Sequence, residues 1–158
     1  MSEQYAALIT EFYRSFQTRQ AQAMADCYHP DAIFSDPAFP RLQGAEIGRM
    51  WGMLLSRATD LDIEFGDIKA DGMTGTARWQ ARYTFSATKR PVVNRIAAEF
   101  QFKDGKIFRH TDRFDFWNWA SQALGPTGLI LGWTPMLKNK VQRQAAEGLR
   151  RYNQKLSA

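Results

Sequence analysis

Two ionisable side chains stand among phenylalanines in a segment with the alternating pattern of a β-strand. If residues 106–116 form a strand, His110 and Asp112 share one face with Phe108, Phe114 and Phe116. Burying an unpaired polar group costs free energy, so these two residues need partners or a task. An imidazole beside a carboxylate can relay a proton. The pattern therefore predicts an acid–base site, a buried polar network, or both.

A second segment offers partners for this pair. In residues 73–86, Arg78 and Gln80 fall on one face of a predicted strand, and Trp79, Tyr83 and Phe85 fall on the other. An ion pair between Arg78 and Asp112 would satisfy both charges. With Arg78 and Gln80 facing the interior, the aromatic residues would cover the outer face of the sheet. There they would form a partner surface or be covered by the C-terminal segment.

Three further residues are candidate ligand contacts. Tyr13 and Trp51 lie on predicted helices, and each either points into a cavity or fills the core. Arg95 lies between Asn94 and Ile96 on a predicted internal strand, where it contacts a ligand or joins a surface pair. The strand register decides which face Arg95 occupies.

The elements that must position these residues follow from a change of hydrophobic period. Spacings of three and four predict helices over 3–18, 20–28 and 45–58. Alternation then predicts strands from residue 61 to 116, separated by turns at Asp71-Gly72 and Asp104-Gly105. An earlier short strand covers 32–36. Helices followed by hairpin-linked strands indicate an α+β domain.

The C-terminal segment differs in composition. Residues 138–158 contain six of the 21 Lys and Arg residues but one of the 16 acids, so the net charge of +5 comes entirely from this end. Residues 138–156 predict an amphipathic helix, with bases opposite an apolar stripe. The stripe either packs on the protein as a clamp or contacts an anionic membrane surface. We favour the clamp, since such stripes usually pack on their own protein.

Two sequence segments resemble the nuclear transport factor 2-like superfamily. One is Tyr28-His29-Pro30-Asp31-Ala32-Ile33-Phe34-Ser35-Asp36-Pro37, and the other is Asp104-Gly105-Lys106-Ile107-Phe108-Arg109-His110-Thr111-Asp112-Arg113-Phe114-Asp115. The resemblance is to the SnoaL-like, limonene epoxide hydrolase-like and ketosteroid isomerase-like branch. It implies a cone: a curved antiparallel sheet packed on three N-terminal helices over residues 1–118. Residues 119–158 would be a helical extension packed on the same domain.

The resemblance also implies roles for individual residues. Asp36 stands where ketosteroid isomerases have their catalytic base, although an Asp before a proline also commonly caps a turn. Asp112 stands at one of the two catalytic carboxylates of limonene epoxide hydrolases, and Gln80 stands at the other. The implied function is binding of a small hydrophobic molecule, with isomerase, cyclase or hydratase chemistry as one outcome. A non-catalytic ligand-binding or accessory domain is the alternative.

Other classes of partner find little support in the sequence. Outside the C-terminal segment the charges balance, which disfavours a nucleic-acid-binding surface. The two histidines lie far apart and no compact ligand cluster exists, so neither a metal nor another cofactor is expected. A single cysteine, Cys27, and an N-terminus without a basic and apolar leader suit the cytoplasm. Members of the resembled superfamily often pair through the outer sheet face, so a homodimer through Trp79, Tyr83 and Phe85 is expected.

Overall fold

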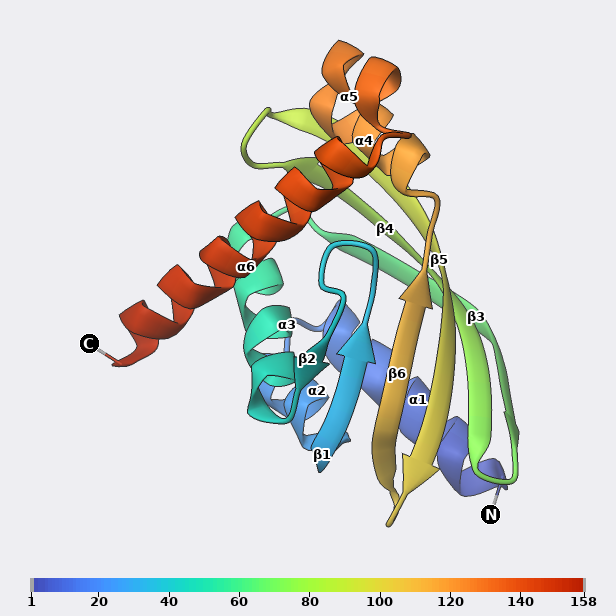
Figure 1. Ribbon diagram of the computed structural model, residues 1–158. Helices are drawn as coiled ribbons and strands as arrows, with labels where there is room; N and C mark the ends of the chain where they lie inside the picture. The colour runs from blue at the N-terminus through green and yellow to red at the C-terminus, as the bar shows by residue number, and fades with distance from the viewer. Residues whose placement is uncertain (1, 158) are drawn as a thin grey trace.

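A curved six-stranded sheet wraps around the N-terminal helix in the computed structural model, which describes residues 2–157 (Figure 1). The predicted domain begins at residue 1 and the predicted helical extension ends at residue 158, and these two residues lie outside the described residues. The helices are α1 (Ser2–Gln17), α2 (Ala21–Asp26), α3 (Ala45–Arg57), α4 (Phe116–Leu124), α5 (Pro126–Leu131) and α6 (Pro135–Ser157). The strands are β1 (Tyr28–Ser35), β2 (Leu42–Gln43), β3 (Asp62–Asp71), β4 (Thr74–Phe85), β5 (Arg90–Lys103) and β6 (Lys106–Arg113). The predicted α+β class is confirmed.

The strand order is β2-β1-β6-β5-β4-β3, and the sheet is mixed. The three hairpin-linked pairs from β3 to β6 are antiparallel, but β1 and β6 run parallel. The predicted fully antiparallel sheet is therefore wrong at this one pairing. The physical reason is topological, because α3 and four strands separate β1 from β6 in sequence and a long connection permits a parallel neighbour.

Burial follows the hydrophobic pattern of each element. On α1 the side chains at helical spacing are buried, and on β5 every second residue from Val92 to Phe102 is buried. β1 begins earlier than predicted and contains Pro30. This residue lies in the irregular stretch between the paired positions Tyr28 and Ile33, where a missing backbone N–H breaks no ladder bond.

The predicted facing of β4 is wrong. Trp79 is buried and points toward the helices, whereas Arg78 lies on the outer face with its side chain 74% exposed. The residues of β4 alternate between two faces as predicted, but the inner and outer faces are exchanged. An arginine in an apolar interior would need a buried counter-charge, while a tryptophan gains free energy from burial there. Arg78 instead lies 4.0 Å from Asp67 on the surface.

A β-bulge changes which residues of β6 share a face. Ile107 and His110 are both buried, and the register with β5 shifts between Gln101 and Phe102. Phe108 consequently lies outside, where its ring meets His29 edge-on. The prediction that Phe108 shares the face of His110 is therefore wrong, because one extra residue in a strand reverses the alternation.

The C-terminal helices add a second hydrophobic cluster to the open end of the curved sheet. α4 packs against β5, and its Trp119 and Ala120 meet Val92 and the first turns of α6. α6 then crosses to α3, where Leu149 is buried and Tyr152 packs beside it (Figure 1). The apolar stripe of α6 thus packs on the protein, as the favoured clamp requires, and most of it is not free for the alternative contact with a membrane surface. No helix within residues 2–157 is long and apolar enough to cross a bilayer.

The predicted dimer surface also does not form as expected. Trp79 is buried, Tyr83 packs between the two hydrophobic clusters, and Phe85 meets Trp119 edge-on at 5.4 Å. The outer sheet face carries charged and polar side chains instead, including Arg78 and Arg95. A homodimer stays a prediction, without these three aromatics as its surface.

Candidate functional site

His110 and Asp112 form a hydrogen-bonded pair on the inner face of β6. His110 Nε2 lies 2.8 Å from Asp112 Oδ1, and both side chains are buried, at 0% and 2% exposure. The carboxylate can only accept, so Nε2–H donates. The same Asp112 oxygen lies 3.4 Å from the indole nitrogen of Trp79. Asp112 is therefore held by β4 rather than by the predicted arginine.

The network continues from His110 into the helical layer. His110 Nδ1 lies 2.7 Å from the hydroxyl of Tyr28, which also accepts a hydrogen bond from the indole N–H of Trp51 at 3.0 Å. Burial holds the pKa of Tyr28 well above its usual value, so the hydroxyl stays protonated. It therefore donates a hydrogen bond to Nδ1 of His110. One consistent direction of donation then runs from Trp51 through Tyr28 and His110 to Asp112.

Aromatic rings enclose the imidazole of His110. Its ring centroid lies 4.4 Å from that of Phe100 and 5.0 Å from that of Phe34, and Phe12 meets it edge-on. Both ring nitrogens are already hydrogen-bonded within this shell. His110 thus has no free atom to offer a ligand in this arrangement and acts as a link in a satisfied network.

Asp36 lies beside Asp112 at the rim of the inner face. The parallel register pairs Phe34 with His110 and Ser35 with Thr111, so the next position places Asp36 next to Asp112. Burial, together with the negative charge of Asp112, raises the pKa of Asp36 to about 7. Asp36 Oδ1 also accepts from the backbone N–H groups of the two residues after Pro37, at 2.8 and 2.6 Å. The turn-capping role is therefore present.

The rim around Asp36 is built by β4, α4 and α6. The Trp119 indole donates to the Tyr83 hydroxyl at 2.8 Å. Burial and, to a smaller extent, the charge of Asp36 raise the pKa of Tyr83. From α6, the side-chain amide of Gln142 donates to the carbonyl of Pro37 at 3.0 Å. α6 therefore covers the turn that carries Asp36.

One buried hydroxyl near this carboxylate pair has no hydrogen-bond partner. Tyr13 Oη is fully buried, and no acceptor or donor among the described residues meets it. Burial and the charge of Asp112 hold the pKa of Tyr13 well above its usual value. Buried polar groups in native proteins are nearly always paired. Tyr13 therefore offers a donor to a polar atom placed near Asp112.

The sequence of this region matches a known family. Residues 9–110 match the model of the SnoaL-like domain. The chain belongs to this family. No curated protein matches it. The predicted nuclear transport factor 2-like membership is confirmed.

The fold of this SnoaL-like domain is similar to the folds of several solved structures. An LEH-like epoxide hydrolase from M. tuberculosis is 17% identical with a TM-score of 0.64, over 82% of this chain and 97% of that one. A candidate polyketide cyclase from Xanthomonas campestris pv. campestris is 20% identical with a TM-score of 0.65, over 77% and 97%. A ketosteroid isomerase-like fold protein from Catenulispora acidiphila, in complex with trimethylamine, is 15% identical with a TM-score of 0.67, over 81% and 97%. At these identities the likeness concerns the fold.

The predicted site residues divide into two groups in this SnoaL-like domain. Tyr13, Trp51, Asp36, His110 and Asp112 lie on the inner side, and their hydrogen bonds or electrostatic effects connect them. The other group is Arg78, Gln80 and Arg95, which meet on the outer face in a shallow pocket. The prediction that Arg78 and Gln80 line the interior is wrong, because the two faces of β4 are exchanged. The register places Arg95, for which either face was possible, on the outer face.

Several members of the site were not predicted. Tyr28, Trp79, Tyr83, Trp119 and Gln142 all bond within the network or at its rim. Tyr28 is the first residue of the segment 28–37 that resembles the superfamily, and this resemblance could have identified it as a member of the site. The others come from elements whose facing or approach depends on tertiary contacts.

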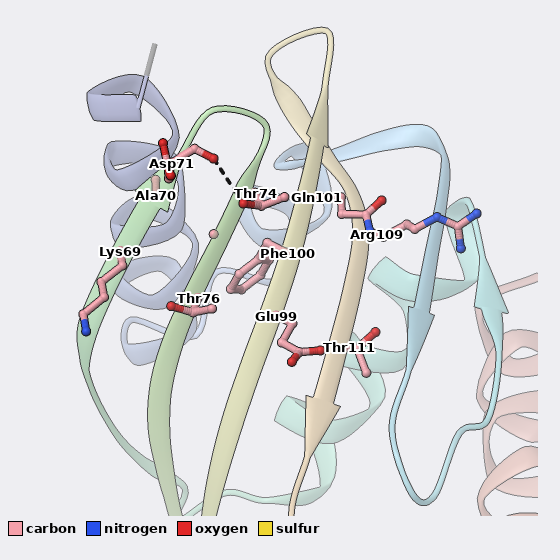
Figure 2. A pocket seen from close by; sticks show the side chains of 11 residues that line it. Lys69, Ala70, Asp71, Thr74, Thr76, Glu99, Phe100, Gln101, Arg109 and Thr111 are labelled. Atoms are coloured by element: carbon pink, nitrogen blue, oxygen red, sulfur yellow. Dashed lines mark hydrogen bonds between the residues drawn. The ribbon is translucent and has the colours of Figure 1, made fainter.

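The open pockets of the described surface lie elsewhere. Figure 2 shows one of them, which is lined by residues of β3 to β6. Its volume is about 430 Å³. Its lining is mostly polar side chains of neighbouring strands, such as Glu99 and Thr111. Neither this pocket nor four others on the described surface is lined by Asp36, His110 or Asp112. Among these residues, no group of three or more His, Cys, Asp or Glu side chains is arranged to hold a metal ion.

Proposed function

We propose that this SnoaL-like domain binds a small apolar carbonyl compound beneath α6 and moves a proton on it, with Asp36 as the base. The observation that carries the proposal is the place of Asp36, beneath α6 and beside Asp112. Burial there and the charge of Asp112 raise the pKa of Asp36 to about 7. A general base works best when its pKa lies near the working pH. An exposed carboxylate with an ordinary pKa would be too weak a base for this task.

The proton transfer needs no group beyond the substrate and the protein. A carboxylate oxygen of Asp36 takes the proton from a carbon beside the carbonyl, and the C–H electron pair moves to give an enolate on the carbonyl oxygen. In a compound with a carbon–carbon double bond next to the deprotonated carbon, the enolate is a dienolate. Asp36, now protonated, returns the proton to the far carbon of that dienolate, which shifts the double bond and completes an isomerisation. In a cyclase, the enolate carbon would instead attack a second carbonyl of the same molecule.

The neighbouring residues have distinct parts in this proposal. The unpartnered hydroxyl of Tyr13 donates a hydrogen bond to the developing enolate oxygen, where a fixed donor is most effective. Asp112 keeps the proton affinity of Asp36 high through its charge. His110 is a positioning residue, because its two nitrogens hold Asp112 and Tyr28. The predicted role of His110 as a direct proton partner is not part of the proposal.

One observation favours a second candidate, a non-catalytic ligand-binding domain. The interior is closely packed around His110, with Tyr13, Trp51 and Phe100 all buried. A ligand must then displace α6 or the turn after Asp36 to reach the carboxylates. In this alternative the polar network only stabilises the fold, and Asp36 only caps its turn.

Deuterium incorporation separates the two candidates without knowledge of the natural substrate. A panel of apolar ketones is incubated with the protein in D2O, and loss of the proton signals beside the carbonyl is followed by NMR. We expect exchange above the buffer rate, with a rate that rises with pH through about 7 as Asp36 ionises. The change Asp36→Asn should reduce it by about 100-fold or more, since a general base typically contributes that much.

The matched control is Asp31→Asn, which removes an exposed carboxylate from the same strand. It should leave the exchange rate unchanged. Saturable ketone binding without exchange would replace the enzyme proposal with the binding alternative. Exchange that survives Asp36→Asn would reject Asp36 as the base.

A further inference from the structure

Five large apolar side chains are exposed together at one end of the molecule. We call them the tip patch, and they occupy α4, α5, the following turn and the start of α6. Its members, with their exposed fractions, are Trp117 (47%), Leu129 (58%), Ile130 (66%), Trp133 (67%) and Met136 (65%). The described residues expose two other large apolar side chains, Met73 and Leu156, which lie in the β3–β4 turn and the last turn of α6. A patch of this kind marks an interaction surface.

The tip patch is a built surface. The indole N–H of Trp117 donates to the carbonyl of Leu129 at 3.0 Å, and that of Trp133 donates to the carbonyl of Ile130 at 2.9 Å. α5 also sits so close to α4 that a Cβ on Gly128 would lie 1.8 Å from the carbonyl oxygen of Ala120. This close approach fixes α5 with Leu129 and Ile130 outward. The indole nitrogens are satisfied, and the rings remain exposed.

The bases beside the tip patch outnumber the acids. Asp115, the exposed N-cap of α4, lies two residues from Trp117. Residues 116–146 contain no Asp or Glu, but they contain Lys138, Lys140 and Arg143. The β4–β5 turn adds Lys89 and Arg90, and Arg90 Nε donates to the carbonyl of Gln122 on α4. Figure 1 shows this turn at the same end of the molecule as α4 and α5. The apolar surface is thus flanked by five bases and, at Asp115, one acid.

This charge pattern selects the partner. A second copy docked tip to tip would bring bases against bases, which disfavours a self-complementary interface. An anionic bilayer offers an apolar layer for the side chains and negative headgroups for the bases at once. Tryptophan is enriched at the membrane–water interface, where its ring lies at headgroup level.

We propose that the tip patch inserts into the interfacial layer of an anionic lipid bilayer, with the bases of the first turns of α6 and of the β4–β5 turn at the headgroups. The contact uses the end of the molecule, and not the stripe of α6 that packs on the protein. It stands apart from the proposed proton transfer and does not depend on it.

Vesicle binding tests the proposal with the full chain. Vesicles of phosphatidylcholine alone are compared with vesicles that contain about 30% phosphatidylglycerol, at low and high salt. We expect sedimentation with the anionic vesicles, weakened by salt, and a blue shift of tryptophan emission. Trp51, Trp79 and Trp119 are buried, so the shift reports Trp117 and Trp133.

Two pairs of variants isolate the apolar and the charged contributions. The double change Leu129→Ser with Ile130→Ser should weaken binding by about tenfold or more, while Met73→Ser at the opposite end leaves it unchanged. The double change Lys138→Gln with Lys140→Gln should weaken binding to anionic vesicles by about tenfold, while Lys155→Gln at the far end of α6 has little effect. Circular dichroism and melting temperature confirm that each variant is folded.

Two results would overturn the proposal. One is a folded wild-type chain that binds neither kind of vesicle. The other is a dimer in size-exclusion chromatography that the Leu129→Ser, Ile130→Ser variant converts to a monomer while vesicle binding is absent, since the tip patch would then join two copies of this chain.

Discussion

The two faces of the sheet place similar residue types in opposite settings. On the inner face, His110 and Asp112 lie 2.8 Å apart and are almost fully buried. On the outer face, Arg78 and Asp67 lie 4.0 Å apart, and both side chains are 74% exposed. A buried carboxylate must be completely hydrogen-bonded to be tolerated, whereas an exposed ion pair exchanges its contacts with water. Consequently, we expect the inner pair to matter for stability and the outer pair to matter little.

The largest expected effect comes from breaking the inner network. The change His110→Ala leaves the Asp112 carboxylate and the Tyr28 hydroxyl buried without their imidazole partner. The free energy of unfolding should fall by about 3–5 kcal/mol, as for other broken buried pairs. Urea denaturation measures this change. A loss below about 1 kcal/mol would mean that water or neighbouring groups replace the imidazole, and the contrast between the faces would fail.

The next largest effect is the pH dependence of stability that Asp36 causes at the rim of the inner face. Its pKa is raised in the folded state from 3.8 to about 7, so folding favours the protonated form. The contribution of Asp36 to stability is therefore complete below pH about 4 and is lost as pH rises through about 7. The change Asp36→Asn keeps an acceptor oxygen for the turn and removes this pH dependence.

Chemical denaturation across this pH range checks the Asp36 prediction. Relative to wild type, Asp36→Asn should gain stability as pH rises, by at most about 4 kcal/mol above pH 8. Asp31→Asn controls for the loss of a negative charge on β1. A wild-type curve that is flat between pH 4 and 8 would show that Asp36 is solvated, and the base proposal would lose its support.

A middle-sized effect is expected where α6 covers the rim. Leu149 of α6 is 4% exposed and belongs to the main hydrophobic cluster, whereas Leu156, two turns later, is 60% exposed. The change Leu149→Ala should cost about 2–4 kcal/mol of unfolding free energy, and Leu156→Ala less than about 0.5 kcal/mol. Thermal denaturation of both variants measures the difference. Equal costs would mean that α6 does not pack against α3 in solution.

The smallest expected effect belongs to the outer face. The change Arg78→Ala should alter the free energy of unfolding by less than about 0.5 kcal/mol, because exposed ion pairs contribute little. The change Gln80→Ala, at the next outward-facing position of β4, serves as the uncharged comparison. A loss of several kcal/mol in Arg78→Ala would indicate that Arg78 enters the interior after all, as the sequence pattern first suggested.

Much of the fold follows from local patterns in the sequence. The helical spacing on α1 and α3, the alternation along β4 and β5, and the Asp-Gly turns fix the elements, because amphipathic segments must bury one face. The candidate pair His110 and Asp112 is also visible in the sequence, since polar residues among phenylalanines demand partners. These inferences need only the periodicity of a helix or a strand.

Tertiary structure decided which partners those residues have. The bulge in β6 moved Phe108 outward, and the facing of β4 placed Trp79 beside Asp112 and left Arg78 in solvent. Alternation defines two faces of a strand but does not say which one meets the helices. That choice depends on the summed burial of all strands and helices, and so does the pKa of Asp36, which arises from its register beside Asp112 and from its burial beneath α6.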